Sequence, residues 1–227
     1  MNPLYIVPTP IGNLDDITIR ALNILKNSDL ILCEDTRRTT KLLNHFSIKK
    51  KLISFYKDNE LSMIDKILDL LESNVISLVS DAGTPAISDP GSKLIKKLNS
   101  KGIQVIPLPG PSSITTAFSA SGLDGEFIFV GFLPKNIKSL IKNLTNLSQI
   151  NKNIILFESP KRIIRLIDES RKIFQNSNLI IFKELTKLNE KIIYLKPEDS
   201  LPEIDLTRGE YILCLLYTSP SPRDNTT

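Results

Sequence analysis

Apolar and polar positions in the first half of the chain follow two alternating patterns. Short, almost wholly apolar runs, such as Leu4–Val7 and Val75–Val79, are each followed by a loop and then by apolar residues three or four positions apart. After the first run, for example, Ile17, Ala21 and Leu25 fall on one face of a helix. Nearly continuous apolar strands that alternate with helices are typical of a parallel sheet covered on both faces. The first half is therefore predicted to be an α/β domain with a parallel sheet.

The pattern changes after Gly122. Five further apolar strands are expected there, with helices predicted only at about 137–147 and 161–174, and the last strands follow one another with little between them. This spacing predicts a mixed sheet in a second α/β domain. We expect the first domain to cover residues 1–112 and the second to cover residues 113–217.

The last ten residues, 218–227, differ in composition from the rest of the chain. They read TSPSPRDNTT and contain no aliphatic side chain that could be buried in a core. We expect them to be a disordered or non-native tail.

Three loops at predicted strand ends are rich in glycine and proline. Pro8–Asn13, Ser80–Gly91 and Pro107–Ser113 together hold four of the nine glycines in the chain. Proline fixes the backbone and glycine allows it to approach a ligand closely, and ligands of open α/β sheets bind beyond the carboxyl ends of the strands. The loops are therefore predicted to form one wall of a small-molecule site, although each alone could be an ordinary turn. Neither a Walker A motif nor a GxGxxG motif is present, so a phosphate cradle is not indicated.

Composition excludes several classes of protein. The 227 residues carry a formal net charge of only +4 with no basic block, so charge alone does not indicate nucleic-acid binding. Cys33 and Cys214 lie in apolar runs and are expected to be buried thiols, and no Asp, Glu, His or Cys spacing suggests a metal site. The chain has no apparent leader and no apolar run near the ~18 residues of a membrane span. We expect a soluble cytoplasmic protein without a membrane partner.

The three loops belong to a longer series of motifs. LYIVPTPIGNLDDIT, EDTR, LVSDAGTPAISDPG, PLPGPSS, GFLP, FESPKRI, ELTK and RGE occur in this order along the chain. They resemble the ribosomal RNA small-subunit methyltransferase I family, which belongs to the tetrapyrrole-methylase-like superfamily, and the resemblance extends from about Leu4 to Leu213. In this family a helical segment usually follows RGEYIL, so the C-terminal end here is expected to be truncated. Ser47 also stands where the family usually has glycine.

The resemblance implies a fold, a cofactor and a reaction. It implies two α/β domains with S-adenosylmethionine in the cleft between them, usually in a homodimer. The implied reaction is methyl transfer to the ribose 2′-hydroxyl of a cytidine in 16S rRNA, with the small ribosomal subunit as partner. The residues implied to bind the cofactor are Ile11, Gly12, Asp81, Gly83, Thr84, Pro85, Ile87, Ser112, Ser113 and Ile114.

Two carboxylates are candidate bases for the ribose hydroxyl proton. Asp35 follows a predicted strand in EDTR, with Arg37 as a candidate phosphate contact, and Glu158 lies in FESPKR beside Lys161 and Arg162, which are also candidate RNA contacts. Both groups are equally consistent with charges at the start of a helix.

Two other functions stay open at this point. One is methylation of a corrinoid or porphyrinoid by an enzyme of the same superfamily, for which a GxGPG-like first loop would be expected in place of PTPIGN. The other is a non-catalytic ribosome-assembly protein that keeps the cofactor cleft.

Overall fold

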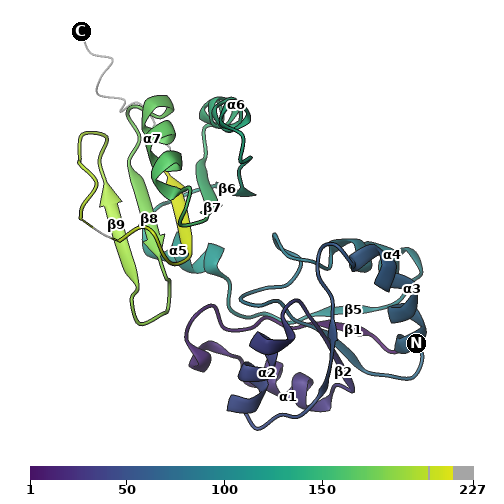
Figure 1. Ribbon diagram of the computed structural model, residues 1–227. Coiled ribbons are helices and arrows are strands. Elements are labelled where there is room, and N and C mark those ends of the chain that lie inside the picture. Colours follow the sequence, from purple (N-terminus) through teal and green to yellow (C-terminus); the bar gives the residue numbers. More distant parts are fainter. Residues whose placement is uncertain (204, 217–227) are drawn as a thin grey trace. The chain divides into compact units, whose positions relative to one another are not determined.

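The computed structural model describes residues 1–203 and 205–216, and the tail expected at 218–227 lies outside the described residues. The chain forms two compact units, Met1–Ser112 and Ser113–Thr227. Each unit has its own five-stranded sheet with helices packed on it (Figure 1). The prediction of an α/β fold with two α/β domains is confirmed.

The first unit contains a wholly parallel sheet with strand order β3-β2-β4-β1-β5. Its elements in chain order are β1 (Leu4–Ile6), η1 (Leu14–Asp16), α1 (Ile19–Asn27), β2 (Leu30–Cys33), α2 (Thr36–His45), β3 (Lys51–Ser54), α3 (Glu60–Leu71), β4 (Ile76–Leu78), α4 (Ser92–Ser100) and β5 (Val105–Pro107).

Alternate residues of these strands face opposite layers of helices, as the side-chain period of two requires. Leu4 and Ile6 of β1 share a core cluster with residues of α3 and α4, such as Leu94. Ile31 and Cys33 of β2 instead lie in a cluster with residues of α1 and α2. The sheet is therefore buried on both faces, which explains its nearly continuous apolar strands.

The strand order places the loop after β4 at a point where the direction of the connections changes. On either side of β4 lie β1 and β2. These two strands lead into α1 and α2 on one face of the sheet, whereas β4 leads into α4 on the other face, and Figure 1 shows the helices on the two faces. In open α/β sheets, ligands bind at the carboxyl edge, at the point where the connections after neighbouring strands leave on opposite faces of the sheet. The loop 79–91 occupies that place.

The second unit contains a mixed sheet with strand order β6-β7-β10-β8-β9, in which only β6 and β7 pair in parallel. Its elements are α5 (Ser113–Ser121), β6 (Phe127–Phe132), α6 (Ile137–Ser148), β7 (Asn153–Glu158), α7 (Ile163–Ile173), β8 (Leu179–Lys183), β9 (Lys191–Leu195) and β10 (Tyr211–Leu215).

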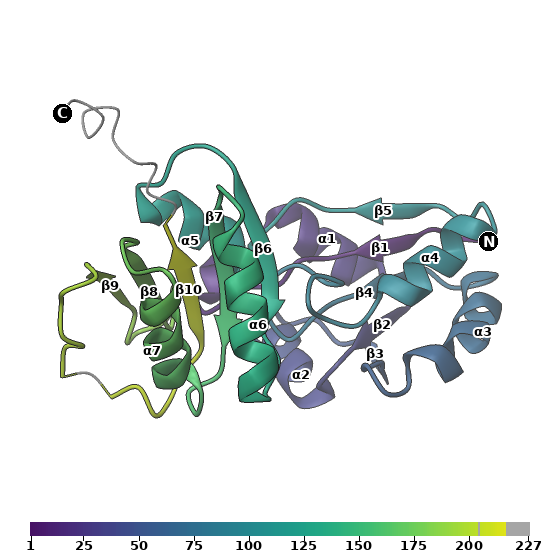
Figure 2. The same ribbon diagram turned by 90° about the horizontal axis from the view of Figure 1, so that it is seen from above.

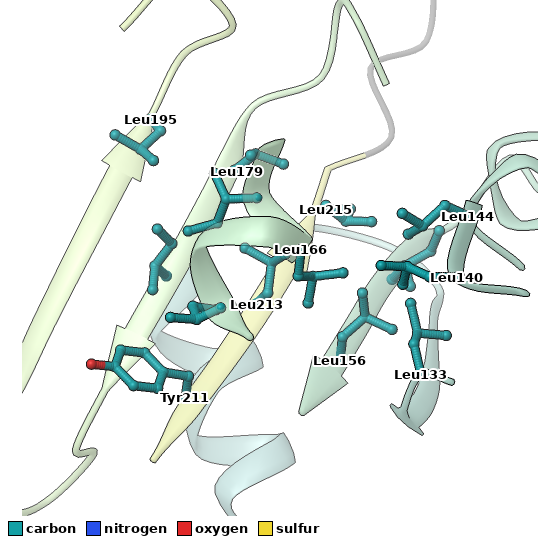
Figure 3. Close-up of a cluster of buried hydrophobic side chains, with 14 of the residues drawn as sticks. Leu133, Leu140, Leu144, Leu156, Leu166, Leu179, Leu195, Tyr211, Leu213 and Leu215 are labelled. Atoms are coloured by element: carbon teal, nitrogen blue, oxygen red, sulfur yellow. The ribbon is translucent and has the colours of Figure 1, made fainter. Parts of the chain in front are cut away.

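The core of the second unit lies between the sheet and α6 and α7. Leu140 and Leu144 of α6 and Leu166 of α7 pack with Leu156 and Leu213 of the central strands (Figure 3). On the other side of the sheet, α5 lies against β10 (Figure 2). The two helices predicted here are confirmed, with ends that differ by at most two residues.

Cys33 and Cys214 are both buried free thiols, as predicted. Among the described residues, no helix is both long and apolar enough to cross a membrane.

Candidate functional site

The three glycine- and proline-rich loops of the first unit contact one another in all three pairs. Thr9 and Gly83 exchange two main-chain hydrogen bonds, Thr9 N to Gly83 O and Gly83 N to Thr9 O, each 2.9 Å long. The Thr84 hydroxyl donates to the Pro111 carbonyl at 3.0 Å. Gly110 packs on Pro8 so closely that a Cβ at Gly110 would lie 2.7 Å from the Pro8 Cβ. The loops after β1, β4 and β5 therefore form one connected structure.

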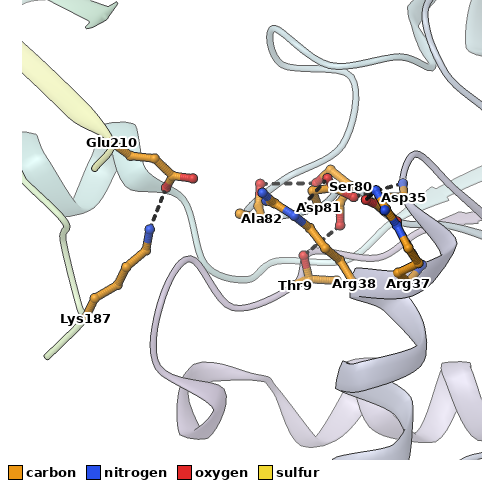
Figure 4. A network of polar contacts seen from close by, with 9 residues as sticks. All are labelled: Thr9, Asp35, Arg37, Arg38, Ser80, Asp81, Ala82, Lys187 and Glu210. Carbon is orange, nitrogen blue, oxygen red and sulfur yellow. Dashed lines mark hydrogen bonds and ion pairs between the residues drawn. The ribbon is translucent and has the colours of Figure 1, made fainter. Parts of the chain in front are cut away.

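Buried hydroxyl groups hold this structure from inside. Thr9 and Ser80 are both buried, and the Thr9 hydroxyl donates to the Ser80 carbonyl at 3.1 Å. The Ser80 hydroxyl lies 3.1 Å from the Gly83 carbonyl and 3.2 Å from that of Ala82 (Figure 4). Because buried polar groups without partners are costly, these bonds favour one conformation of the loop.

The loop after β4 contains backbone conformations that L-residues rarely adopt. Gly83 and Gly91 have φ values of +78° and +129°, and the non-glycine residues Ala86 and Ser88 have φ values of +66° and +63°. A non-glycine residue in this region costs of order 1–3 kcal/mol and persists only when its surroundings fix it. Such strain is frequent in ligand-binding loops.

The candidate cofactor residues lie in all three loops and at the start of α5. Ile11, which is buried, packs beside Gly83, where an added Cβ would lie 3.3 Å from Ile11 Cγ2. The exposed Gly12 belongs to the same loop as Ile11. The candidates in the loop after β4 are Asp81, Gly83, Thr84, Pro85 and Ile87, of which Pro85 is buried and Ile87 is 40% exposed. Ser112 is the last residue of the first unit, whereas Ser113 and Ile114 begin α5 in the second unit.

The charges of the three loops fit a cationic ligand. PTPIGN, SDAGTPAISDPG and PLPGPSS contain no Lys, Arg or His, and their only charged side chains are Asp81 and Asp89. A phosphate-bearing cofactor would require cationic partners or a cradle of N–H groups at a helix N-terminus. S-adenosylmethionine carries a sulfonium, an ammonium and a carboxylate group, with a net positive charge and no phosphate, so loops with two acidic and no basic side chains fit this methyl donor.

Asp81 connects the loop after β4 to the start of α2. Its Oδ1 accepts from the main-chain N–H of Asp35 at 3.0 Å, and its Oδ2 lies 3.6 Å from Nε of Arg38 (Figure 4). Sequence reasoning placed Asp81 in the cofactor loop but did not foresee this contact, because it depends on β2 and β4 being neighbours.

Asp89 is a half-buried carboxyl group of the same edge, and sequence reasoning did not select it. Burial raises its pKa to about 7, the negative charges of Glu34 and Asp81 add to this effect, and a hydrogen bond with Ser80 partly opposes it. Burial also raises the pKa of Glu34. No group of His, Cys, Asp or Glu in the described part of the chain is arranged to hold a metal ion.

Asp35, the first candidate base, is held by Arg37. Its Oδ1 accepts from the Arg37 main-chain N–H at 2.8 Å and from Arg37 Nε at 3.0 Å, and its Oδ2 accepts from Nη2 at 2.7 Å. These bonds hold the Asp35 pKa well below its usual range. Asp35 is thus the N-cap of α2 and a weak proton acceptor, while the Arg37 side chain is 86% exposed.

Glu158, the second candidate base, is buried in an ion pair. Its Oε1 lies 2.6 Å from Nη2 of Arg162 and accepts from the Ser159 N–H at 2.6 Å, and only 2% of its side chain is exposed. Arg162 Nη1 also donates to the Leu133 carbonyl at 3.1 Å, so the pair joins GFLP to FESPKR. This geometry argues against Glu158 as a base and Arg162 as an RNA contact; Lys161 is exposed.

The ELTK and RGE motifs are joined to each other within the second unit. Glu184 Oε1 accepts from Lys187 Nζ at 2.9 Å and from the Glu210 N–H at 2.8 Å, and Lys187 Nζ also lies 3.0 Å from Glu210 Oε2 (Figure 4). Gly209 packs against the Glu184 side chain. A Cβ added at Gly209 would lie 2.9 Å from Glu184 Cγ. Two motifs that are distant in sequence thus form one surface feature.

Comparisons with known proteins show the family of the chain. The profile of the family described as Tetrapyrrole (Corrin/Porphyrin) Methylases matches residues 3–199. The chain is 45% identical over 209 residues to a protein of Thermotoga maritima named ribosomal RNA small subunit methyltransferase I, with 90% of this chain and 93% of that protein covered. A protein of the same name from Halalkalibacterium halodurans is 46% identical over 192 residues, with 84% of this chain and 66% of that protein covered.

Solved structures show the same fold at low sequence identity. The structure of a diphthine synthase matches with a TM-score of 0.71 and 16% identity, covering 95% of this chain and 90% of that one. The cobalt precorrin-4 methyltransferase CbiF matches with a TM-score of 0.68 and 19% identity, covering 93% and 94%. The profile match and the close relatives together show that the chain belongs to the tetrapyrrole methylase family and, within it, to the ribosomal RNA small subunit methyltransferase I group.

Proposed function

We propose that this chain transfers a methyl group from S-adenosylmethionine to the ribose 2′-hydroxyl of a cytidine in 16S rRNA. The observation that carries the proposal is the connected set of three loops at one sheet edge, which contacts itself in all three pairs and contains no cationic side chain. The name of the relatives that are 45–46% identical supports small-subunit rRNA as the substrate.

The main task of the loops is to orient the methyl donor. S-adenosylmethionine supplies an activated methyl group on a positively charged sulfur. The donor would be held by rigid main-chain turns and short side chains of Ile11, Gly83, Thr84 and Pro85. Orientation of reacting groups can lower a barrier by roughly 7–11 kcal/mol, so a fixed backbone suits a reaction whose donor is already reactive. Asp81 lies on the same edge, 3.6 Å from Arg38 Nε, and would adjoin the cationic donor while it holds the loop to the start of α2.

Two exposed cations remain candidates for contacts with RNA phosphates. Arg37 keeps its guanidinium exposed while Asp35 fixes its orientation, and Lys161 is exposed beside the buried Glu158–Arg162 pair. Few aromatic residues are present, at 6% of the chain, so contacts to phosphate and to RNA shape would supply most of the affinity. We further propose that the protein acts in the cytoplasm as a homodimer, as the family resemblance implies.

Methylation assays with two alternative substrates test the proposal. Radiolabelled S-adenosylmethionine would be incubated with the protein and either small ribosomal subunits that lack the modification or a precorrin-type tetrapyrrole. Transfer to the rRNA alone is the expected result. Transfer to the tetrapyrrole alone would establish the other enzymatic function, and donor binding without transfer to either would favour a non-catalytic assembly protein.

A further inference from the structure

Glu60, the first residue of α3, is a buried carboxylate outside the three loops. It is only 3% exposed. Its Oε1 accepts from the main-chain N–H groups of Gly91 at 3.1 Å, Lys93 at 2.9 Å and Leu94 at 3.3 Å. These three groups are at the N-terminus of α4, which begins where the loop after β4 ends. One side chain of α3 thus caps a different helix.

The capping from a distance has a steric reason. The first N–H groups of a helix have no partner within the helix and are usually capped by Ser, Thr, Asp or Asn. At α4 the cap residue is Gly91, which has a φ of +129° and no side chain to offer. A Cβ at Gly91 would lie 2.7 Å from Leu78 Cδ2, so a residue with a capping side chain does not fit. Glu60 supplies the missing acceptor, and its negative charge favours this end of the helix.

We propose that Glu60 is the positioning residue that fixes the downstream end of the methyl-donor loop, an inference that rests on the proposed role of this loop in cofactor binding. The upstream end of the loop follows β4 and is held by the Thr9–Gly83 hydrogen bonds. Glu60 holds the other end at Gly91. Between these anchors lie Ala86 and Ser88 with left-handed backbones, which require both ends to be fixed.

Loss of the Glu60 carboxylate should lower the affinity of the protein for the methyl donor. Three N–H groups would lose their acceptor, and two of them belong to the buried residues Gly91 and Leu94. The candidate donor contacts Thr84, Pro85 and Ile87 would then no longer be held in one arrangement. Glu60 itself is not among the residues proposed to contact the donor or the RNA, so the chemical step should be preserved once the donor is bound.

The test compares Glu60→Gln and Glu60→Ala with two control variants of the full chain. Asp65→Asn removes an exposed carboxylate of the same helix, and Leu98→Ala destabilises α4 at the end distant from the loop. Calorimetry gives the Kd for S-adenosylmethionine, and initial rates with small ribosomal subunits give kcat and the KM for each substrate.

We expect Glu60→Ala to raise the Kd and the KM for the donor about tenfold, with kcat and the KM for subunits changed by less than about twofold. Glu60→Gln keeps an oxygen acceptor without the charge, so its Kd should rise only about threefold. Both control variants should bind the donor as the wild type does. An unchanged Kd in Glu60→Ala and Glu60→Gln, or an equal loss in Leu98→Ala, would overturn the proposal. Donor binding by the wild type without methyl transfer to rRNA would reject the proposed substrate, while the Kd values would still decide the role of Glu60.

Discussion

Thr9 and Gly83 pair in an antiparallel bridge just beyond the ends of β1 and β4, two strands that themselves run parallel. The chain after β4 must therefore turn back on itself, and the left-handed backbone of Gly83, with a φ of +78°, is part of this reversal. The reversal brings Gly83 against Ile11 of the first loop. One glycine thus determines how two of the three loops meet.

Replacement of Gly83 should impair cofactor binding more than it impairs folding. Gly83→Ala places a side chain in a left-handed conformation, at a cost of about 1–2 kcal/mol in the free energy of unfolding. Its Cβ would also lie 3.3 Å from Ile11 Cγ2, so the Ile11 side chain, a candidate donor contact, must move by a few tenths of an ångström. We expect the Kd for S-adenosylmethionine to rise at least about tenfold, which calorimetry would measure.

Gly102→Ala is the matched control for Gly83→Ala. Gly102 also has a left-handed φ, of +69°, but no atom lies within 4 Å of the position of an added Cβ. The cost in unfolding free energy should again be about 1–2 kcal/mol, with an unchanged Kd for the donor. Equal donor affinities in the two variants would contradict a role of the Gly83 loop in binding.

The Glu158–Arg162 ion pair is expected to be structural. Removal of one charge of a buried pair leaves the other without a partner, which typically costs about 3–5 kcal/mol. Glu158→Gln and Arg162→Met should each lower the free energy of unfolding substantially in urea titrations. The double variant should be more stable than the sum of the two losses predicts. Normal stability of Glu158→Gln together with a loss of methyl transfer would instead restore Glu158 as a candidate base.

Asp89 makes stability depend on pH. The pKa of an aspartate is ordinarily 3.8 and is raised to about 7 in the folded protein, so the folded state binds more protons across this interval. The contribution of Asp89 to stability is therefore fully present below about pH 4 and is lost as the pH rises through 7.

Asp89→Asn removes this dependence. Because Asp89 is only half-buried and solvent screens its charge, we expect Asp89→Asn to stabilise the protein by about 1–2 kcal/mol at pH 8. At pH 4 the gain should be close to zero, and urea titrations at the two pH values would measure both. A gain of equal size at both pH values would contradict the assignment. A destabilising charge at Asp89 would be consistent with a role of this residue in activity. The pH profile of methyl transfer should therefore be compared between the wild type and Asp89→Asn.

Ser47 is a site outside the three loops at which a substitution can stabilise the protein. It follows α2 with a φ of +54°, while the next residue, Ile48, donates its N–H to the Leu43 carbonyl. Glycine is favoured at such a helix end because it adopts this conformation without strain. We expect Ser47→Gly to raise the free energy of unfolding by about 0.5–1 kcal/mol, measured by thermal or urea unfolding.

Ser62→Gly provides the opposite control. Ser62 is a helical residue of α3, so glycine there should lower the free energy of unfolding by about 0.5 kcal/mol. Destabilisation by Ser47→Gly would show that the hydroxyl of Ser47 matters more than its backbone.

The sequence predicts the architecture well because the strands of the first unit are buried on both faces and read as apolar runs. It also predicts that the loops at Pro8, Ser80 and Pro107 follow strand ends. Their mutual contacts could not be predicted, because these depend on β1 lying between β4 and β5, an order that local patterns do not contain. The family resemblance supplied the family, the donor and the substrate.

The side-chain chemistry was predicted less well, for similar reasons. FESPKR shows an acid and a base four residues apart, but their burial follows from packing against the GFLP segment at Leu133. The raised pKa of Asp89 results first from its burial and then from the nearby charges of Glu34, which follows another strand, and Asp81, and neither can be read from the local sequence. The link from Glu60 to Gly91 joins residues on different helices and has no local signature.

Mapping of the methylated nucleotide tests the central claim most directly. Unmodified small ribosomal subunits would be treated with the wild type or with Gly83→Ala and labelled S-adenosylmethionine, and the rRNA would be digested and analysed by mass spectrometry. The account predicts one added methyl group on the ribose of a cytidine with the wild type and strongly reduced labelling at low donor concentration with the variant. A methyl group on a base, or no transfer to rRNA by a wild type that binds the donor, would contradict it.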